Sequence, residues 1–543
     1  MQKIPGWQQS IPFVAAACEE TDYEVVFPVM PVTSKPKEIK KAHRERVHQE
    51  SAFNVMVARP VTKQEMESTQ KGRDAIAKEW GGHRDKKTWD ESTVREWEDV
   101  KAETKAKNVK AGKEVVKTHV ASLMEVDVEK NSELPDEDPR KKMKCRVVYR
   151  GDATKDEMGM AAIFNELGSA PATMEATKAA DTYGLFEGHT TQTSDAEMAY
   201  TQAKLATTLK QADGSIVALE TWVRLPKARW PPQWHGKFKD PVVRLVLALY
   251  GHPDAGGCWE QHCNKAMTEL GWIPIPEWQS SFFHPKLKLM VTIYVDDLKM
   301  SGPTSNMDEG WRLIKSKIQI EPPTSASGTK FLGAMHTSYE RIIEDGVNPF
   351  TKLDKDQASA GGNAVLKAKS KVKVRVMEYD MKDFLVSCVD KYLELTGSTR
   401  KQLRPASTPF LEVKAEEIYA ELEEAEKAGS NAVQGALKPH AAKVLMKLLY
   451  AARMMRYDLL KAISLLASKI TKWSEICDRL LHRLVCYVNE TVDMKLYSWV
   501  GDKISDVHLR LSADADLASY VPSMKSTSGT YLSLHGVETQ RVL

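Results

Sequence analysis

The sequence predicts a protein of mixed α+β class that is built from several domains. Its 543 residues exceed what a single hydrophobic core usually organises, so we expect three or more domains. Hydrophobic residues make up 42% of the chain and charged residues 28%, a composition typical of globular proteins rather than disordered ones. Strand-type alternation and helix-type spacing both recur along the chain. Together these observations predict separate folded units, and no internal repeat is visible.

Charge and cysteine usage exclude several classes of protein. Lys and Arg total 77 against 74 for Asp and Glu, so net charge by itself does not indicate nucleic-acid binding. No apolar run approaches the roughly 20 residues of a membrane span, and the first residues lack the apolar region of a signal peptide. The seven cysteines form no CxxC pair, which argues against a zinc finger or a disulfide framework. We therefore expect an intracellular protein, cytoplasmic or nuclear, that is not secreted and has no membrane partner.

The N-terminal part begins with a segment of uncertain order and continues with a hairpin. Residues 1–75 are predicted to be a leader, whose basic run over 35–46 is typical of a solvated arm. A charged stretch over 94–107 predicts a solvated helix. Alternation over 119–128 and again over 144–150 predicts two strands that form a basic hairpin around a polar loop.

The middle of the chain alternates helices with strands. Helical spacing or helix-favouring composition and turn residues at the ends predict helices over 172–180, 258–270 and 311–318. A short polar strand over 190–194 leads into Asp195. Residues 226–241 are rich in Pro and Trp and predict an irregular surface segment.

The C-terminal part is predicted to be mostly helical. A small, polar and basic stretch is typical of a linker or insertion, and long helical patterns follow it before two strand-like segments. The linker covers 358–371, the helices 380–395, 415–427 (ended by Gly429), 441–470 and 473–488, and the strands 507–511 and 530–534.

Two adjacent carboxylates stand at the tip of a predicted β-hairpin. The run 289–300 is apolar and β-branched up to Asp296 and Asp297, and a second strand-like stretch leaves them. Asp-Asp is a poor hairpin turn by itself, because the two like charges repel and the preferred turns contain Asn-Gly or Asp-Gly. A divalent metal ion facing the tip would explain the pair. The alternative is an ordinary solvated turn.

The order of motifs around this hairpin resembles the reverse transcriptase of copia-type LTR retrotransposons. The likeness covers roughly residues 80–540, and it depends on shared order and spacing rather than on any one motif. The matching segments are Lys144–Gly151, Asp195–Tyr200, Leu249–Gly251 with Trp259, Tyr294–Asp297, Phe331–Gly333, Ser407–Pro409, Leu448–Ser468, and Ser512–Asp516 with Ser526–Gly529.

The resemblance implies a right-hand polymerase with fingers, palm and thumb, followed by a helical connection and a truncated RNase H-like piece. The implied boundaries are fingers over 76–190, palm over 191–305, palm end and thumb over 306–410, connection over 411–500, and the RNase H-like fragment over 501–543. The implied function is RNA-directed DNA polymerisation. The implied partners are an RNA or DNA template with its primer and dNTPs, and the oligomeric state stays open.

The resemblance also implies which carboxylates carry the chemistry. Nucleotidyl transfer uses two metal ions about 3.5–4 Å apart, and hard divalent ions take oxygen ligands. By likeness, Asp195, Asp296 and Asp297 are the catalytic residues and ligands of two Mg²⁺ (or Mn²⁺) ions, with the backbone carbonyl of Ala196 as a further ligand. An interaction protein with a chance hairpin would instead place Asp195 far from Asp297.

Three further sets of residues take roles by the same likeness. Lys144 and Arg146 would bind the incoming triphosphate, and Tyr200 would wall the sugar pocket against a ribose 2′-hydroxyl. Phe331, Leu332 and Gly333 would support the primer terminus, with Gly333 allowing close backbone approach. The alternatives are a solvated strand face for the two cations and plain core packing for the aromatic and apolar residues.

The sequence departs from the family pattern at two places. Asp254 stands where the family usually has Gln, an odd charge if that position touches a triphosphate. Asp514 matches the first RNase H acid, but no later matching acid precedes Leu543, so we expect no RNase H activity. The alternative function is therefore a catalytically inactive retroelement remnant that at most binds nucleic acid.

Overall fold

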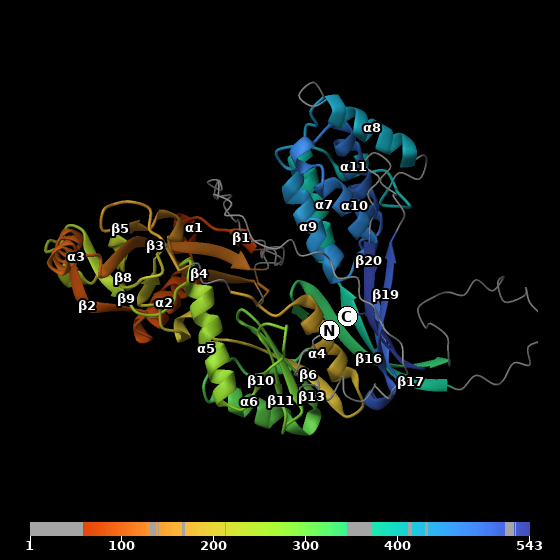
Figure 1. Cartoon of the computed structure of the whole chain (residues 1–543), viewed down its shortest axis with the longest axis horizontal. Helices are drawn as coiled ribbons and strands as arrows, with labels where there is room; N and C mark the ends of the chain where they lie inside the picture. The colour runs from red at the N-terminus through yellow and green to blue at the C-terminus, as the bar shows by residue number, and fades with distance from the viewer. Residues whose placement is uncertain are drawn as a thin grey trace, which may run out of the picture.

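A computed structural model of the chain has a mixed α+β fold with three β-sheets (Figure 1). Several predicted features lie outside the described residues, among them the basic run over 35–46, Gly429 and nearly all of the linker over 358–371. The structure describes residues 58–542 except 131–136, 139–140, 166–168, 212, 345–370, 411–414, 429–432, 516–525 and 527.

The N-terminal sheet is organised by one long strand, β3 (Val116–Lys130). It pairs antiparallel with β4 (Lys142–Tyr149), which confirms the predicted basic hairpin, and parallel with β8 (Ile216–Arg224). The remaining strands of this sheet are β1 (Ala58–Pro60), β2 (Trp89–Glu96), β5 (Lys155–Asp156), β7 (Thr208–Lys210) and β9 (Pro241–Leu245).

Three helices accompany this sheet, and the first two of them begin earlier in the chain than expected. α1 (Lys63–Ser68) and the start of α2 (Gln70–Asp85) fall within the segment predicted to be a leader, and Met66 is fully buried there. α3 (Trp97–Ala111) confirms the predicted charged helix. Acidic residues in its first turn favour the positive end of the helix dipole, and Gly112 ends it in the left-handed conformation.

The central sheet is antiparallel throughout and contains the predicted hairpin, but the turn is Val295–Asp296 rather than the predicted Asp-Asp pair, because Asp297 begins the second strand. Its strand order is β10-β11-β12-β13-β6-β14, so β6 pairs with the second strand of the hairpin. The bounds are β6 (His189–Asp195), β10 (Ile273–Pro274), β11 (Ser281–His284), β12 (Leu289–Tyr294), β13 (Asp297–Pro303) and β14 (Thr324–Ser325).

The two faces of the central sheet have different chemistry. Ile293, Leu298 and Met300 are buried on one face, in a core with α5 (Ala255–Glu269) and α6 (Met307–Lys315). Because side chains alternate along a strand, the other face carries Asp297 and Lys299. The helix α4 (Met174–Leu185) contacts β6, β12 and β13, and it also contacts β17 of the third sheet. This double contact explains why most of α4 is buried.

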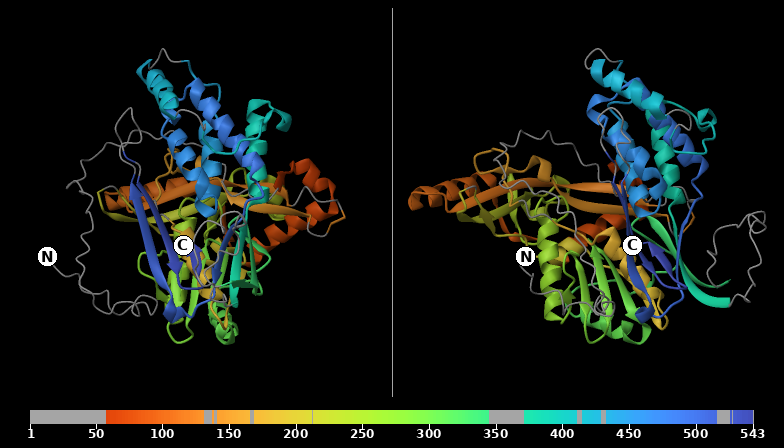
Figure 2. Two further views of the ribbon diagram at one scale, coloured as in Figure 1. Left: turned by 90° about the vertical axis from the view of Figure 1, so that its right-hand side faces the viewer. Right: turned by 45° about the vertical axis from the view of Figure 1, so that its right-hand side comes forward.

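The third sheet joins the central region to the C-terminal helices (Figure 2). Its order is β15-β16-β17-β18-β21-β20-β19, with bounds β15 (Thr329–Phe331), β16 (Ala334–Glu344), β17 (Lys371–Asp380), β18 (Leu496–Val500), β19 (His508–Ala515), β20 (Ser528–His535) and β21 (Gln540–Val542). The helices gather at one end of it in Figure 1, and they are α7 (Lys382–Thr396), α8 (Ala415–Ala428), α9 (Ala441–Met454), α10 (Leu460–Ala467) and α11 (Glu475–Glu490).

One predicted helix is wrong in its extent. The pattern over 441–470 predicts a single helix, but α9 ends at Met454 and α10 begins at Leu460. Arg456 occupies the break, only 2% exposed, where its guanidinium donates to the carboxylate of Asp458 and to the carbonyl of Thr491. A buried charge that needs these partners fixes the break, and apolar periodicity alone does not reveal it.

No helix in the described part of the chain is both long enough and apolar enough to cross a bilayer.

Candidate active site

The turn that joins β12 to β13 has a strained backbone. Tyr294 pairs with Asp297, so Val295 and Asp296 form a two-residue turn, and Val295 has a φ of +59°. A β-branched residue rarely adopts a positive φ. Two hydrogen bonds hold the turn: the Trp259 Nε1–H donates to the Val295 carbonyl at 2.6 Å, and the Ala196 N–H donates to the Asp296 carbonyl at 2.6 Å. Such strain persists where neighbouring contacts determine the conformation.

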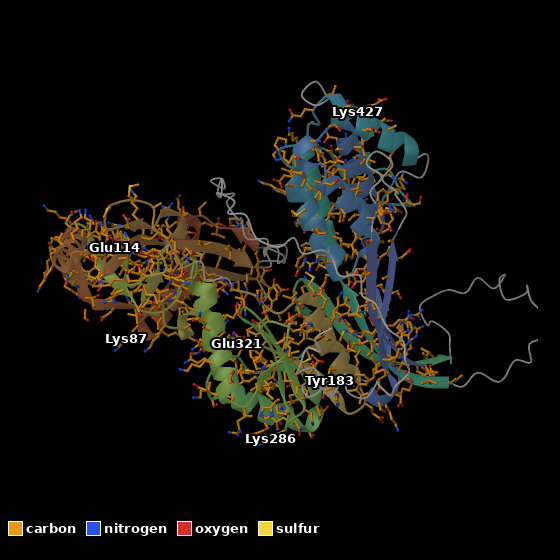
Figure 3. The ribbon with its side chains drawn as sticks, viewed as in Figure 1. Lys87, Glu114, Tyr183, Lys286, Glu321 and Lys427 are labelled. Atoms are coloured by element: carbon orange, nitrogen blue, oxygen red, sulfur yellow. The ribbon has the colours of Figure 1, made fainter. Side chains whose placement is uncertain are left out.

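The strand register brings Asp195 directly opposite Asp297. Both residues stand at the ends of neighbouring antiparallel strands and on the same face, and their carboxyl groups hydrogen-bond to each other. Asp195 is exposed, and its backbone carbonyl accepts from the Glu321 N–H at 2.8 Å; Figure 3 labels Glu321. An interaction protein with a chance hairpin is expected to hold Asp195 far from Asp297. The structure contradicts that expectation, because the two acids are direct neighbours across the strands.

The pKa values of Asp195 and Asp297 are both raised. Burial, then the charges of Asp296 and Asp195, raise the pKa of Asp297 to about 7. Loss of hydration and the charge of Asp296 likewise raise the pKa of Asp195. Asp296 is thus close enough to act electrostatically on both acids. Like charges that crowd in this way favour an added proton or a cation.

The pair Asp195 and Asp297 could hold a hard divalent cation, with Asp296 beside it. Carboxylate oxygens are the ligands that Mg²⁺ and Mn²⁺ prefer, so the donor set fits these ions. Within the described residues, no group of three or more His, Cys, Asp or Glu side chains is arranged as a complete ligand set. Of the predicted carboxylate ligands, Asp195 and Asp297 lie directly opposite each other, and Asp296 lies in the adjoining turn. The Ala196 peptide flanks the pair through its N–H bond to Asp296.

Basic side chains of the β3–β4 hairpin face the acids. Lys144 and Arg146 alternate with buried residues of β4, and Lys130 ends the neighbouring strand. Burial and the repulsion of Arg146 and Lys130 lower the pKa of Lys144 to about 8, although Asp296 partly opposes the shift. The positive charge of Lys130 acts to lower the pKa of Asp195 and Asp297, and it thereby opposes the rise caused by burial and by the neighbouring acids. These electrostatic effects place Lys144 near the acids, with Arg146 acting on Lys144, and they add Lys130, which sequence reasoning missed.

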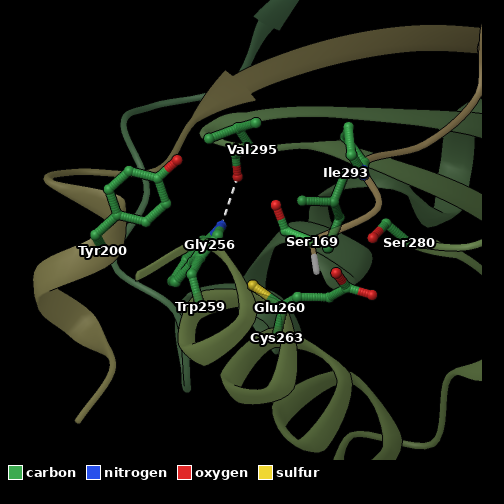
Figure 4. Close-up of a pocket in the computed structure, with 10 residues that line it drawn as sticks. Ser169, Tyr200, Gly256, Trp259, Glu260, Cys263, Ser280, Ile293 and Val295 are labelled. Atoms are coloured by element: carbon green, nitrogen blue, oxygen red, sulfur yellow. Dashed lines mark hydrogen bonds between the residues drawn. The ribbon is translucent and has the colours of Figure 1, made fainter. Parts of the chain in front are cut away.

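Aromatic rings line the space beside the acids. Tyr200 lies in a short 3₁₀ helix, Ala199–Gln202, and its ring packs edge-on against Tyr250 with centroids 4.5 Å apart. The Arg146 guanidinium stacks on the other ring at 4.7 Å from the Tyr250 centroid. Tyr200, Trp259 and Val295 also line a small pocket of about 20 Å³, room for about one water (Figure 4). Tyr250 therefore lies beside the acids, although the sequence analysis matched it only as part of the segment Leu249–Gly251 and gave it no role.

The predicted primer-support residues form the tip of another hairpin, between β15 and β16. Leu332 and Gly333 both have positive φ, +49° and +77°, so Gly333 serves the turn itself. The Leu332 carbonyl accepts from the Tyr450 hydroxyl at 2.7 Å. Phe331 is buried, with the Lys299 ammonium 4.0 Å from its ring centroid. The tip is thereby tied to β13, two residues from Asp297.

Lys299 also belongs to a fully buried polar network under the acids. Its ammonium donates to Asp181 of α4 at 2.8 Å, and the Tyr379 hydroxyl donates to the same carboxylate at 2.9 Å. His336 lies 3.3 Å from that carboxylate, and Arg541 bonds Tyr379. Burial alone would raise the pKa of Asp181, but the charges of Lys299 and His336 hold it below its usual range. The network connects all three of α4, the central sheet and the third sheet.

The structure also places the two acids that the sequence analysis discussed separately, Asp254 and Asp514. Asp254 is fully buried just before α5, where the Asn165 amide approaches its carboxylate at 3.5 Å. Asp514 lies on the exposed strand β19, opposite Gly529.

Neither a protein-family model nor a curated protein matches this chain.

Proposed function

We propose that the protein is an RNA-directed DNA polymerase, which transfers a nucleotide from a dNTP to a primer 3′-hydroxyl. The observation that carries the proposal is the register that sets Asp195 opposite Asp297, with Asp296 in the adjoining turn. Two strand ends that present carboxylates to one point are what nucleotidyl transfer requires. The resemblance to copia-type reverse transcriptases adds support, because it selects the same three residues.

Asp195 and Asp297, with Asp296, would hold Mg²⁺ or Mn²⁺. When bound, these ions activate the primer hydroxyl and neutralise charge on the triphosphate. The protein's own task is then to position the reactants. The strained turn at Val295 fixes the acids, and the buried network below β13 keeps that strand in register.

The residues around the acids suit a dNTP. Lys144 and Arg146 lie on the hairpin that faces the carboxylates, where they can bind the triphosphate, and Arg suits bidentate contact. Tyr200, five residues after Asp195, would contact the sugar and exclude a 2′-hydroxyl sterically. The Leu332–Gly333 tip is held near β13 and could support the primer end.

In this proposal the first two sheets and the C-terminal helices take the parts of a right-hand polymerase. The N-terminal sheet would be the fingers, the central sheet the palm, and the helices α7 to α11 the thumb and connection. The template–primer would be recognised by its backbone and shape, because base pairing reads the template sequence.

Primer extension tests the proposal directly. The purified full chain receives poly(rA)/oligo(dT), dTTP and Mg²⁺, and we expect extension that Asp297→Asn and Asp195→Asn each reduce by about 10³-fold or more, as for loss of a group that acts mainly in the transition state. Asp308→Asn is the matched control, because Asp308 is an exposed acid in the first turn of α6. It removes the same charge without touching the site.

The alternative function predicts a different result from the same proteins. A remnant that only binds nucleic acid would retain the primer–template in a filter-binding assay and extend nothing above the Asp297→Asn level. Extension that is equal in the wild type and both site variants would show a contaminating polymerase and would remove the proposal.

A further inference from the structure

The strand β19 forms an open edge of the third sheet. It pairs with β20 through eight consecutive residue pairs, and no other strand of the described residues pairs with it. All eight of its residues, His508–Ala515, are exposed. Its unpaired N–H and C=O groups are therefore a template for another strand. Figure 2 shows β19 and β20 as a long ribbon at the side of the molecule.

Two features that protect many exposed strands, a proline and a bulge, are absent from the described residues of this edge. It contains no Pro, and its register with β20 is continuous, without a bulge. One face carries Leu509 and Leu511, which are 50% and 61% exposed, next to Leu532 of β20 at 38%. A long, regular edge with an apolar face predicts association rather than a solvated end.

The charges of β19 select the partner. Arg510 and Asp514 lie four residues apart on the opposite face from Leu509 and Leu511, and neither is in a salt bridge within the described residues. We propose that β19 pairs antiparallel with β19 of a second copy of this chain, about a two-fold axis through Ser512. This inference is independent of the proposed polymerase function.

The register follows from the sequence of the strand. A two-fold axis perpendicular to the sheet at Ser512 sets Arg510 of each copy opposite Asp514 of the other, so two opposite-charge pairs form at once. It also sets Leu511 opposite Ala513 of the second copy and keeps both apolar faces on one side of the joined sheet. Moving the axis to Leu511 instead pairs Arg510 with Ser512 and forms no Arg–Asp pair. Among registers that pair residues of β19 with one another, only the axis at Ser512 forms Arg–Asp pairs.

Charge reversal tests this register on the full chain. In Arg510→Asp, both cross-strand pairs become Asp–Asp, and in Asp514→Arg both become Arg–Arg. We expect sedimentation velocity to show a concentration-dependent dimer for the wild type and at least a tenfold weaker dimer for each variant, equivalent to about 1.4 kcal/mol. Circular dichroism and the thermal midpoint, unchanged because both residues are exposed, check that the variants fold.

Mixing the two variants gives the decisive result. The aspartate that replaces Arg510 in one variant then faces the arginine that replaces Asp514 in the other. The remaining pair keeps Asp514 against Arg510, so an equimolar mixture should recover dimer of wild-type strength. The double variant, Arg510→Asp with Asp514→Arg, should also dimerise alone.

Three results would overturn the proposal. A wild type that stays monomeric at about 200 µM does so, because even weak specific interfaces associate at that concentration. Dimers that persist in both single variants, or a mixture that stays monomeric, overturn it equally, since they would assign the edge to another partner or register.

Discussion

The buried pair Lys299–Asp181 offers a severe test of how the central sheet is held. Both side chains are fully buried and 2.8 Å apart. Asp181→Asn would leave the Lys299 ammonium without its carboxylate, facing only the ring of Phe331 and the imidazole of His336. Removing one partner of a buried ion pair costs about 3–5 kcal/mol, because the remaining charge stays desolvated. We expect a loss of that size.

The matched control is Asp383→Asn, which breaks the exposed ion pair Lys330–Asp383. The Lys330 ammonium lies 2.7 Å from the Asp383 carboxylate, a distance similar to that of the buried pair. Side chains there are 39% and 69% exposed, so the cost should be below about 1 kcal/mol. Lys299→Met should cost less than Asp181→Asn, because Asp181 keeps the Tyr379 hydroxyl and His336 as partners. Urea unfolding followed by tryptophan fluorescence measures all three variants. A difference below about 1 kcal/mol between Asp181→Asn and Asp383→Asn would refute the reasoning.

Three further predictions address the site and the fold. Tyr200→Ala should raise incorporation of rCTP relative to dCTP at least tenfold, about 1.4 kcal/mol of discrimination, in single-nucleotide extension; an unchanged ratio would remove its role as a sugar gate. Because the pKa of Lys144 is about 8, its charge is present below that pH and lost above it, so kcat/KM for dTTP should fall as the pH rises through 8; Lys144→Arg should abolish that fall, since Arg stays charged. Burial lowers the pKa of His119 from its usual 6.5 to about 4. Between these two pH values the unfolded chain binds a proton at His119 that the folded chain does not, so the free energy of unfolding should fall from pH 6.5 toward pH 4. His119→Leu should recover about 2 kcal/mol of that loss at pH 5 in urea titrations, because neither ring nitrogen has a hydrogen-bond partner; an unchanged pH profile would contradict it.

Elements whose pattern is local could be predicted from the sequence. The β12–β13 hairpin, the β3–β4 hairpin and the helix α5 follow from alternation, spacing and turn residues within each segment. The polar residues that lead into Asp195 also predicted the short strand β6. Its pairing with β13 could not be derived from that strand alone, since strand order depends on contacts between distant segments.

Features that depend on burial of charge could not be predicted. Lys299 looks like a solvated residue in sequence, yet it is fully buried because Asp181 reaches it from α4. Arg456 interrupts a helix for the same kind of reason. Lys130 and Tyr250 join the site only because a strand pair and a ring contact bring them there. In each case the partner is remote in sequence, and a pattern within one segment cannot name it.

The strained turn explains why the acids need so much support. A positive φ at Val295 is unfavourable for a β-branched residue, by about 1–3 kcal/mol for such strained conformations, so the turn would relax if its contacts were weak. The Trp259 indole and the Ala196 N–H each bind a carbonyl of the turn, and they come from α5 and from the residue after β6. Repulsion between Asp296 and its neighbouring acids adds to the strain. The turn therefore carries both backbone strain and charge repulsion. A cation bound at the acid pair would relieve the charge repulsion, which gives a physical reason for a site of this kind.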